Sequence, residues 1–149
     1  MQRPDSARSI APDADVIRHQ TLSLPPEAVS ARRARSWVSD QLPDIGEDAR
    51  DTLRLLTSEL VTNAVVHART PLQVSLSLTR TDVLVEVFDL DLDLDLGHVA
   101  AGMPDRDGGR GLTLVEHLAS SHGRVQHPGG GKTYWFRLAL AVEPSSLRT

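Results

Sequence analysis

The sequence contains no cysteine, which excludes disulfide bonds and metal sites built on thiolates. Aromatic residues make up only 3% of the chain, so its core must be built mainly from Leu, Val and Ala. No stretch approaches the ~20 consecutive apolar residues of a membrane-spanning helix. The first residues, MQRPDSARSIAPDADVIRH, lack the apolar segment of a signal peptide. We therefore expect a cytoplasmic protein that does not associate with membranes.

A strong charge of one sign is also missing. The 149 residues carry a net charge of −4, which argues against the basic surface that nucleic-acid binding needs. An apolar content of 40% is enough for the core of one domain of ordinary size. The polar residues 1–18 predict a mobile tail, and residues 143–149 a second tail. We expect one domain over residues 19–142 and no nucleic-acid partner.

The hydrophobic patterns predict strands and helices in an order typical of an α+β fold. We expect a two-layer sandwich in which helices cover one face of a mixed, mostly antiparallel sheet. The predicted strands cover residues 19–24, 71–80, 81–89, 124–128 and 132–142. The predicted helices cover residues 28–42, 47–68 and 111–123. Glycine and proline within residues 90–110 predict a loop.

Apolar residues at helical spacing predict which side of the first two helices is buried. In the helix over residues 28–42 they are Val29, Ala34, Trp37, Val38 and Leu42. In the helix over residues 47–68 they are Leu53, Leu56, Leu60 and Ala64. The arginines of the first helix, Arg32, Arg33 and Arg35, favour a solvated face over a partner-binding surface.

Polar residues accompany the apolar side of the second helix, in the stretch SELVTNAVVHA. Glu59, Asn63 and His67 are four residues apart, and four residues advance a helix by about 400°, so these side chains form one stripe. The stripe is either an amphipathic boundary with solvated side chains or a cation site. A carboxylate and an amide oxygen one turn apart suit Mg²⁺, which keeps several waters and needs few protein ligands. His67 could then donate a hydrogen bond to a phosphate, whereas Zn²⁺ would need further His or Cys ligands.

Two glycine-rich stretches predict different local structures. GGRGL, residues 108–112, opens the predicted third helix, where free backbone N–H groups attract phosphate. PGGGKT, residues 128–133, is consistent with a hairpin turn. It is not a Walker loop, because the glycine spacing fails and a strand follows it.

Together, the motifs SELVTNAVVHA, VEVFD, GGRGLTLVEHLA and GGGKTYWFRL resemble the GHKL ATPase superfamily in their order and separation. Within it, the chain is similar to the anti-sigma-factor serine/threonine kinases and related short ATP-binding regulators of bacteria. The resemblance covers roughly residues 20–141. It implies ATP and Mg²⁺ as cofactors.

The resemblance implies a role for each matching residue. Glu59 matches the acidic residue that polarises the attacking hydroxyl or water, and Asn63 matches the Mg²⁺-coordinating asparagine. Asp89 matches the aspartate that accepts a hydrogen bond from the adenine amino group. His67 has a counterpart in this subgroup.

The glycine-rich box and the last strand match the part of the family site that holds phosphates. Gly109 and Gly111 match glycines whose backbone amides, here those of Gly109, Arg110, Gly111 and Leu112, meet the phosphates under a lid. Thr133 matches a threonine that lies near the nucleotide.

The segment DLDLDLDLG, residues 89–97, departs from the family pattern D-x-G-x-G. Asp91 and Asp93 replace both glycines, adding side chains and negative charge near an anionic ligand. Two like charges ~4 Å apart repel by about 1 kcal/mol in water and several times more near a protein surface. An EF-hand loop does not fit, because no start at Asp89, Asp91 or Asp93 places glycine sixth and glutamate twelfth. We expect a strand end that enters a lid.

Two functions follow. The resemblance implies a kinase that transfers the γ-phosphoryl of ATP to an antagonist protein (an anti-anti-sigma factor), sequesters a sigma factor, or does both, and that can form a homodimer. The alternative is a degenerate GHKL domain that binds proteins without catalysis and binds nucleotide weakly or not at all. Glu59 and Asn63 favour the enzyme, whereas Asp91 and Asp93 favour the binding module.

Overall fold

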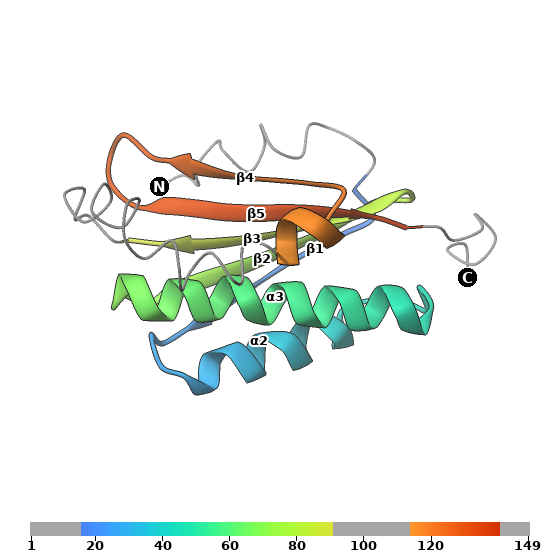
Figure 1. Cartoon of the computed structure of the whole chain (residues 1–149), viewed down its shortest axis with the longest axis horizontal. Helices are drawn as coiled ribbons and strands as arrows, with labels where there is room; N and C mark the ends of the chain where they lie inside the picture. Colours follow the sequence, from blue (N-terminus) through green and yellow to red (C-terminus); the bar gives the residue numbers. More distant parts are fainter. Residues whose placement is uncertain (1–15, 91–113, 141–149) are drawn as a thin grey trace.

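The computed structural model describes residues 16–90 and 114–140, which form a sheet with helices on one face (Figure 1). Its strands lie in the order β1-β2-β3-β5-β4, and every neighbouring pair is antiparallel. The elements are β1 (Arg18–Leu24), α2 (Val29–Asp40), α3 (Glu47–Ala68), β2 (Leu72–Leu78), β3 (Asp82–Asp89), β4 (Ser121–Gln126) and β5 (Lys132–Ala139). The predicted α+β fold, with helices over one face of a mostly antiparallel sheet, is confirmed.

The helix α3 begins and ends at the predicted residues. Gly46 precedes it with φ of 96°, Glu47 and Asp48 lie in its first turn, and Arg69 ends it in the left-handed conformation. Negative charge near the first turn stabilises a helix because the free N–H groups there carry partial positive charge. The predicted buried residues Leu53, Leu56, Leu60 and Ala64 are at most 1% exposed.

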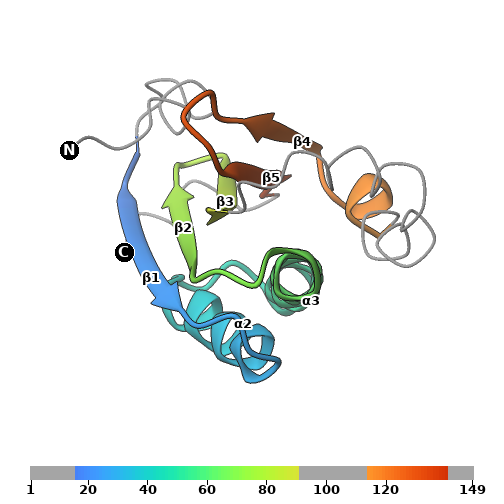
Figure 2. The same ribbon diagram turned by 90° about the vertical axis from the view of Figure 1, so that its left-hand side faces the viewer.

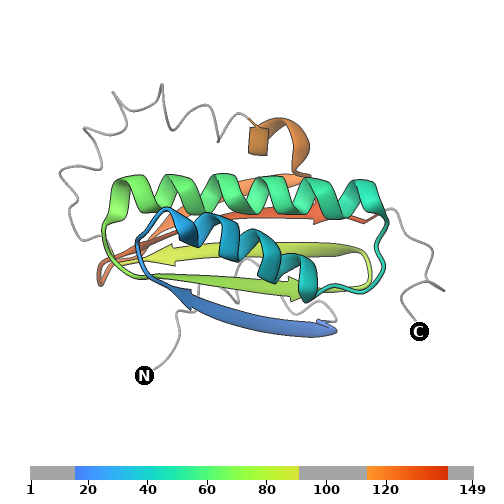
Figure 3. The ribbon, with the colours of Figure 1, turned by 90° about the horizontal axis from the view of Figure 1, so that it is seen from below.

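Both helices pack against the same face of the sheet, with α2 toward β1 and α3 farther along the sheet (Figure 2). The same helices lie side by side when the molecule is seen from below (Figure 3). Arg50 of α3 ties their connection, since its guanidinium donates to the backbone oxygens of Ser39 and Pro43. The core between the layers consists mainly of Leu and Val side chains.

One buried position of α2 was predicted wrongly. Val29 is 40% exposed, and Ser30 lies inside instead, where its hydroxyl donates to the backbone oxygen of Pro25. Ser30, Ala34 and Val38 share one face at intervals of four residues, so Val29 lies about 100° away from it. The predicted burial of Ala34, Val38 and Leu42 is confirmed, and Trp37 is partly buried.

The predicted helix over residues 111–123 is wrong at its end. In the described part of the chain, helix covers residues 114–118, and β4 begins at Ser121. The residues 121–123 pair with β5 instead, so that Gly123 lies opposite Trp135. A Cβ on Gly123 would lie 2.8 Å from the Trp135 ring, so the glycine lets the two strands come together.

Within residues 16–90 and 114–140, no helix is both long and apolar enough to cross a membrane. The predicted domain boundaries at residues 19 and 142, and the two predicted tails, stay predictions.

Candidate functional site

The stripe of Glu59, Asn63 and His67 lies along the edge of the buried face of α3. Asn63 is only 8% exposed, whereas Glu59 and His67 are half-buried. None of the three side chains makes a hydrogen bond or ion pair with a residue in the described ranges. Because most buried polar groups have a partner, the amide of Asn63 is suited to bind a ligand, an ion or water.

Among the residues that the structure describes, no three His, Asp or Glu side chains are placed to hold a metal ion together. Mg²⁺ retains several waters and takes few protein ligands when phosphates supply the rest. The role of Asn63 as its ligand stays a prediction.

Asp89 ends β3 as a fully buried carboxylate, with 0% of its surface exposed. Lys132 begins β5 directly opposite, and its Nζ donates to Asp89 Oδ1 at 3.2 Å. The Lys132 side chain is 8% exposed, so both charges are nearly removed from water. A buried charge is costly unless an opposite charge or hydrogen bonds accompany it, and each residue supplies this to the other.

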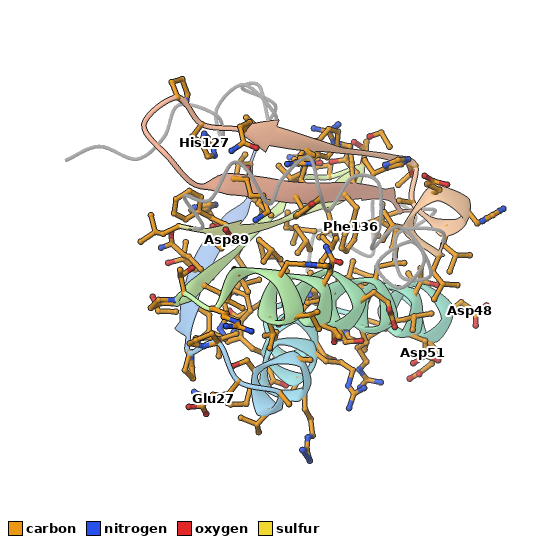
Figure 4. The ribbon with its side chains drawn as sticks, turned by 60° about the vertical axis from the view of Figure 1, so that its left-hand side comes forward. Glu27, Asp48, Asp51, Asp89, His127 and Phe136 are labelled. Carbon is orange, nitrogen blue, oxygen red and sulfur yellow. The ribbon has the colours of Figure 1, made fainter. Side chains whose placement is uncertain are left out.

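Asp89 belongs to β3 and the polar stripe to α3, and the C-terminal ends of these two elements lie on the same side of the molecule. Figure 1 shows the ends of α3 and β3 there, beside the start of β5. In Figure 4, Asp89 lies between the sheet and α3, while Asp48 and Asp51 mark the opposite end of the helix. Since α3 packs against β3 and β5, the fold brings the helical stripe and the buried carboxylate to one region.

The hairpin between β4 and β5 packs directly against Asp89. Its turn is closed by hydrogen bonds from the N–H of His127 to the oxygen of Gly131 and from the N–H of Gly130 to the oxygen of His127. Gly130 and Gly131 have φ of 112° and 92°, which glycine adopts most readily. A Cβ on Gly131 would lie 2.6 Å from the backbone oxygen of Asp89. The predicted hairpin turn is thus confirmed, and its glycine allows close contact with the end of β3.

The structure does not place the side chain of Thr133 beside Asp89. Successive residues of a strand point to opposite faces, and Asp89 pairs with Lys132 while Phe88 pairs with Thr133. The Thr133 hydroxyl instead lies 2.8 Å from His127 Nε2, and the His127 ring packs against Phe88. Burial lowers the pKa of His127. The nucleotide contact of Thr133 stays a prediction, and Lys132 is the β5 side chain beside Asp89.

The remaining predicted site residues, Gly109, Arg110, Gly111 and Leu112, lie outside the described residues, as do Asp91 and Asp93. The predicted strand ends at Asp89, and the N–H of Leu90 donates to Thr70 Oγ1 at 3.1 Å.

Sequence reasoning missed the ion pair of Lys132 with Asp89. The pattern of alternating residues predicts both strands, but β3 and β5 are far apart in sequence. Their register therefore could not be read from a short turn. The turn glycines immediately before Lys132 were the only signal that this residue approaches another element.

The chain matches the model of the histidine kinase-like ATPase domain family over residues 24–138, from the end of β1 to the last residue but one of β5. No match was found among curated proteins. The matched region contains Asn63, Asp89 and Lys132, and the observed α+β fold is consistent with the family. The chain belongs to the histidine kinase-like ATPase domain family.

Proposed function

We propose that the protein binds ATP with Mg²⁺ where α3 ends beside β3, and that it is a regulator resembling the anti-sigma-factor serine/threonine kinases. Membership in the family implies ATP binding in general. The observation that supports this site best is the pair of buried polar residues, Asn63 on α3 and Asp89 at the end of β3. The resemblance assigns Asn63 to the metal and Asp89 to the base.

In this proposal each residue has one task. Asp89 accepts a hydrogen bond from the adenine amino group, and Asn63 helps to hold Mg²⁺ at the phosphates. Glu59, half-buried one turn before Asn63, accepts the proton of a serine or threonine hydroxyl as its oxygen attacks the γ-phosphorus. The bond from that phosphorus to the bridging oxygen breaks, and ADP leaves. Such transfer depends on positioning and charge neutralisation more than on covalent chemistry by the protein.

The proposed partners follow from the resemblance. A cytoplasmic sigma factor would be held by the domain, and an antagonist protein would carry the accepting hydroxyl. The protein could act as a homodimer. Phosphorylation of the antagonist would then decide which partner is bound.

The ion pair of Asp89 with Lys132 favours the second candidate function, a non-catalytic protein-binding module. The carboxylate expected to receive adenine already accepts a hydrogen bond from an ammonium. Asp91 and Asp93 add negative charge to the following segment. A domain of this kind would bind partners with weak or no dependence on nucleotide.

The kinase would release phosphate from ATP slowly with water as the acceptor, whereas the binding module would not. This release can be measured without an identified antagonist. Glu59→Gln should slow release by about 100-fold or more, because general bases contribute at least that much, while ATP affinity stays within about threefold. Glu47→Gln is the matched control, since it makes the same change at the exposed first residue of α3. Equal release by wild type and Glu59→Gln would remove Glu59 as the base. Absent ATP binding would favour the binding module.

A further inference from the structure

The ion pair at the end of the sheet places a donor and an acceptor side by side. Asp89 and Lys132 are partners in the register of β3 and β5, with 3.2 Å between Oδ1 and Nζ. Because β3 and β5 are paired in the sheet, the backbones of Asp89 and Lys132 are held in fixed relative positions. Their side chains are 0% and 8% exposed. A ligand that reaches them therefore meets little competing water, which strengthens each hydrogen bond.

The two side chains offer different chemistry to a base. A carboxylate only accepts hydrogen bonds and has about four lone-pair sites, so contact with an ammonium does not exhaust it. An ammonium only donates, through three N–H groups. A carboxylate alone would bind the adenine amino group but would repel a carbonyl oxygen at the same position of the purine.

With the ammonium present, a 6-oxopurine also matches the pair. Its carbonyl oxygen can accept from Lys132, and its N1–H can donate to Asp89. Both hydrogen bonds would involve a charged partner, and such bonds are roughly twice as strong as neutral ones. Lysine is also a common partner of the guanine carbonyl oxygen in nucleic-acid recognition. Adenine can donate from its amino group to Asp89 and accept at N1 from Lys132, so Lys132 removes the discrimination against the oxo group without excluding adenine.

We propose that Lys132 widens the choice of base, so that this site binds 6-oxopurine nucleotides, of the inosine or guanosine type, about as tightly as ATP. This inference rests on the proposed nucleotide site at Asp89. It follows from the geometry of the ion pair and departs from the adenine preference that the resemblance implies.

The test is a calorimetric titration of the full chain with ATP, ITP and GTP in the presence of Mg²⁺. ITP is the decisive probe because it lacks the adenine amino group and carries the 6-oxo group without the 2-amino group of guanine. Lys132→Met keeps an unbranched side chain that is one atom shorter and removes the ammonium. It should lower ITP affinity by about 5- to 150-fold, as expected when a buried carbonyl loses its donor, and change ATP affinity less.

Arg124→Met is the control, because it removes an exposed cation from β4 outside the ion pair. It should leave the ratio of ATP to ITP affinity unchanged. Circular dichroism would show whether Lys132→Met folds; if it does not, the wild-type ratio decides.

Support requires that wild-type ITP affinity exceeds ATP affinity or lies within about tenfold of it and, where Lys132→Met folds, that this variant shifts the ratio toward ATP by at least about threefold. A wild type that prefers ATP by more than tenfold overturns the role of Lys132 and leaves the nucleotide site intact. An unchanged ratio in a folded Lys132→Met protein does the same. Absent binding of all three nucleotides overturns the inference and the proposed site together.

Discussion

Gly131 couples the hairpin between β4 and β5 to the buried end of β3, and its replacement by alanine should destabilise the fold strongly. Its φ of 92° is a conformation that side chains rarely adopt. The added Cβ would also lie 2.6 Å from the backbone oxygen of Asp89 and 3.0 Å from the Phe88 ring. The backbone oxygen belongs to a paired strand, so it cannot move away as the tip of a flexible side chain could.

The expected loss of stability in Gly131→Ala has two parts. A non-glycine residue at positive φ costs about 1–3 kcal/mol. Overpacking a tight contact costs about 1–3 kcal/mol more. Since one shift of the hairpin would relieve part of both, we expect Gly131→Ala to lower the free energy of unfolding by about 2–4 kcal/mol.

The assay is urea denaturation followed by circular dichroism, with Gly129→Ala as the matched control in the same turn. A Cβ on Gly129 would meet nothing within 4 Å, and its φ is not positive. Gly129→Ala should be neutral or stabilising by up to about 1 kcal/mol, because alanine restricts the unfolded chain. Equal stability of the two variants would refute the close contact between the hairpin and Asp89.

Three further predictions test the packing and the polar contacts. Leu53→Ala removes a fully buried side chain and should cost about 2–5 kcal/mol in urea denaturation, against about 0.5 kcal/mol for Leu55→Ala, which is 38% exposed; equal costs would contradict the orientation of α3. Gly123→Ala should cost about 1–3 kcal/mol and alter the fluorescence of Trp135, and an unchanged spectrum would contradict their contact. Burial lowers the pKa of His127 below 6.5 in the folded chain, so the unfolded chain binds the proton more readily and stability should fall as pH decreases below 6.5. His127→Gln should remove that part of the pH dependence, and an unchanged pH profile would contradict it.

The features predicted correctly depend on residues close together in sequence. The bounds of α3 follow from the acidic first turn and from leucines at helical spacing, both of which act within a few residues. The same periodicity places Glu59 and Asn63 on one stripe. The hairpin turn before Lys132 is likewise local, because its glycines supply the φ values that the turn needs.

The features that were missed depend on contacts between distant segments. The predicted helix continued through ASSHG, residues 119–123, yet Gly123 joins β4 because Trp135 of another strand lies over it. The ion pair between Asp89 and Lys132 depends on the register of β3 with β5. A shift of one residue in that register would turn Lys132 to the opposite face, and the sequence of either strand alone does not determine it.

The central claim is that a nucleotide binds at Asn63 of α3 and Asp89 of β3, and calorimetric titration with ATP and Mg²⁺ tests it most directly. We expect wild-type affinity in the micromolar to sub-millimolar range and a loss of about tenfold in Asn63→Ala, as for one lost hydrogen bond to a charged group. Thr62→Ala, which changes the exposed neighbour on α3, should bind as the wild type does. No heat of binding at millimolar ATP, or equal affinity of Asn63→Ala and Thr62→Ala, would contradict the claim.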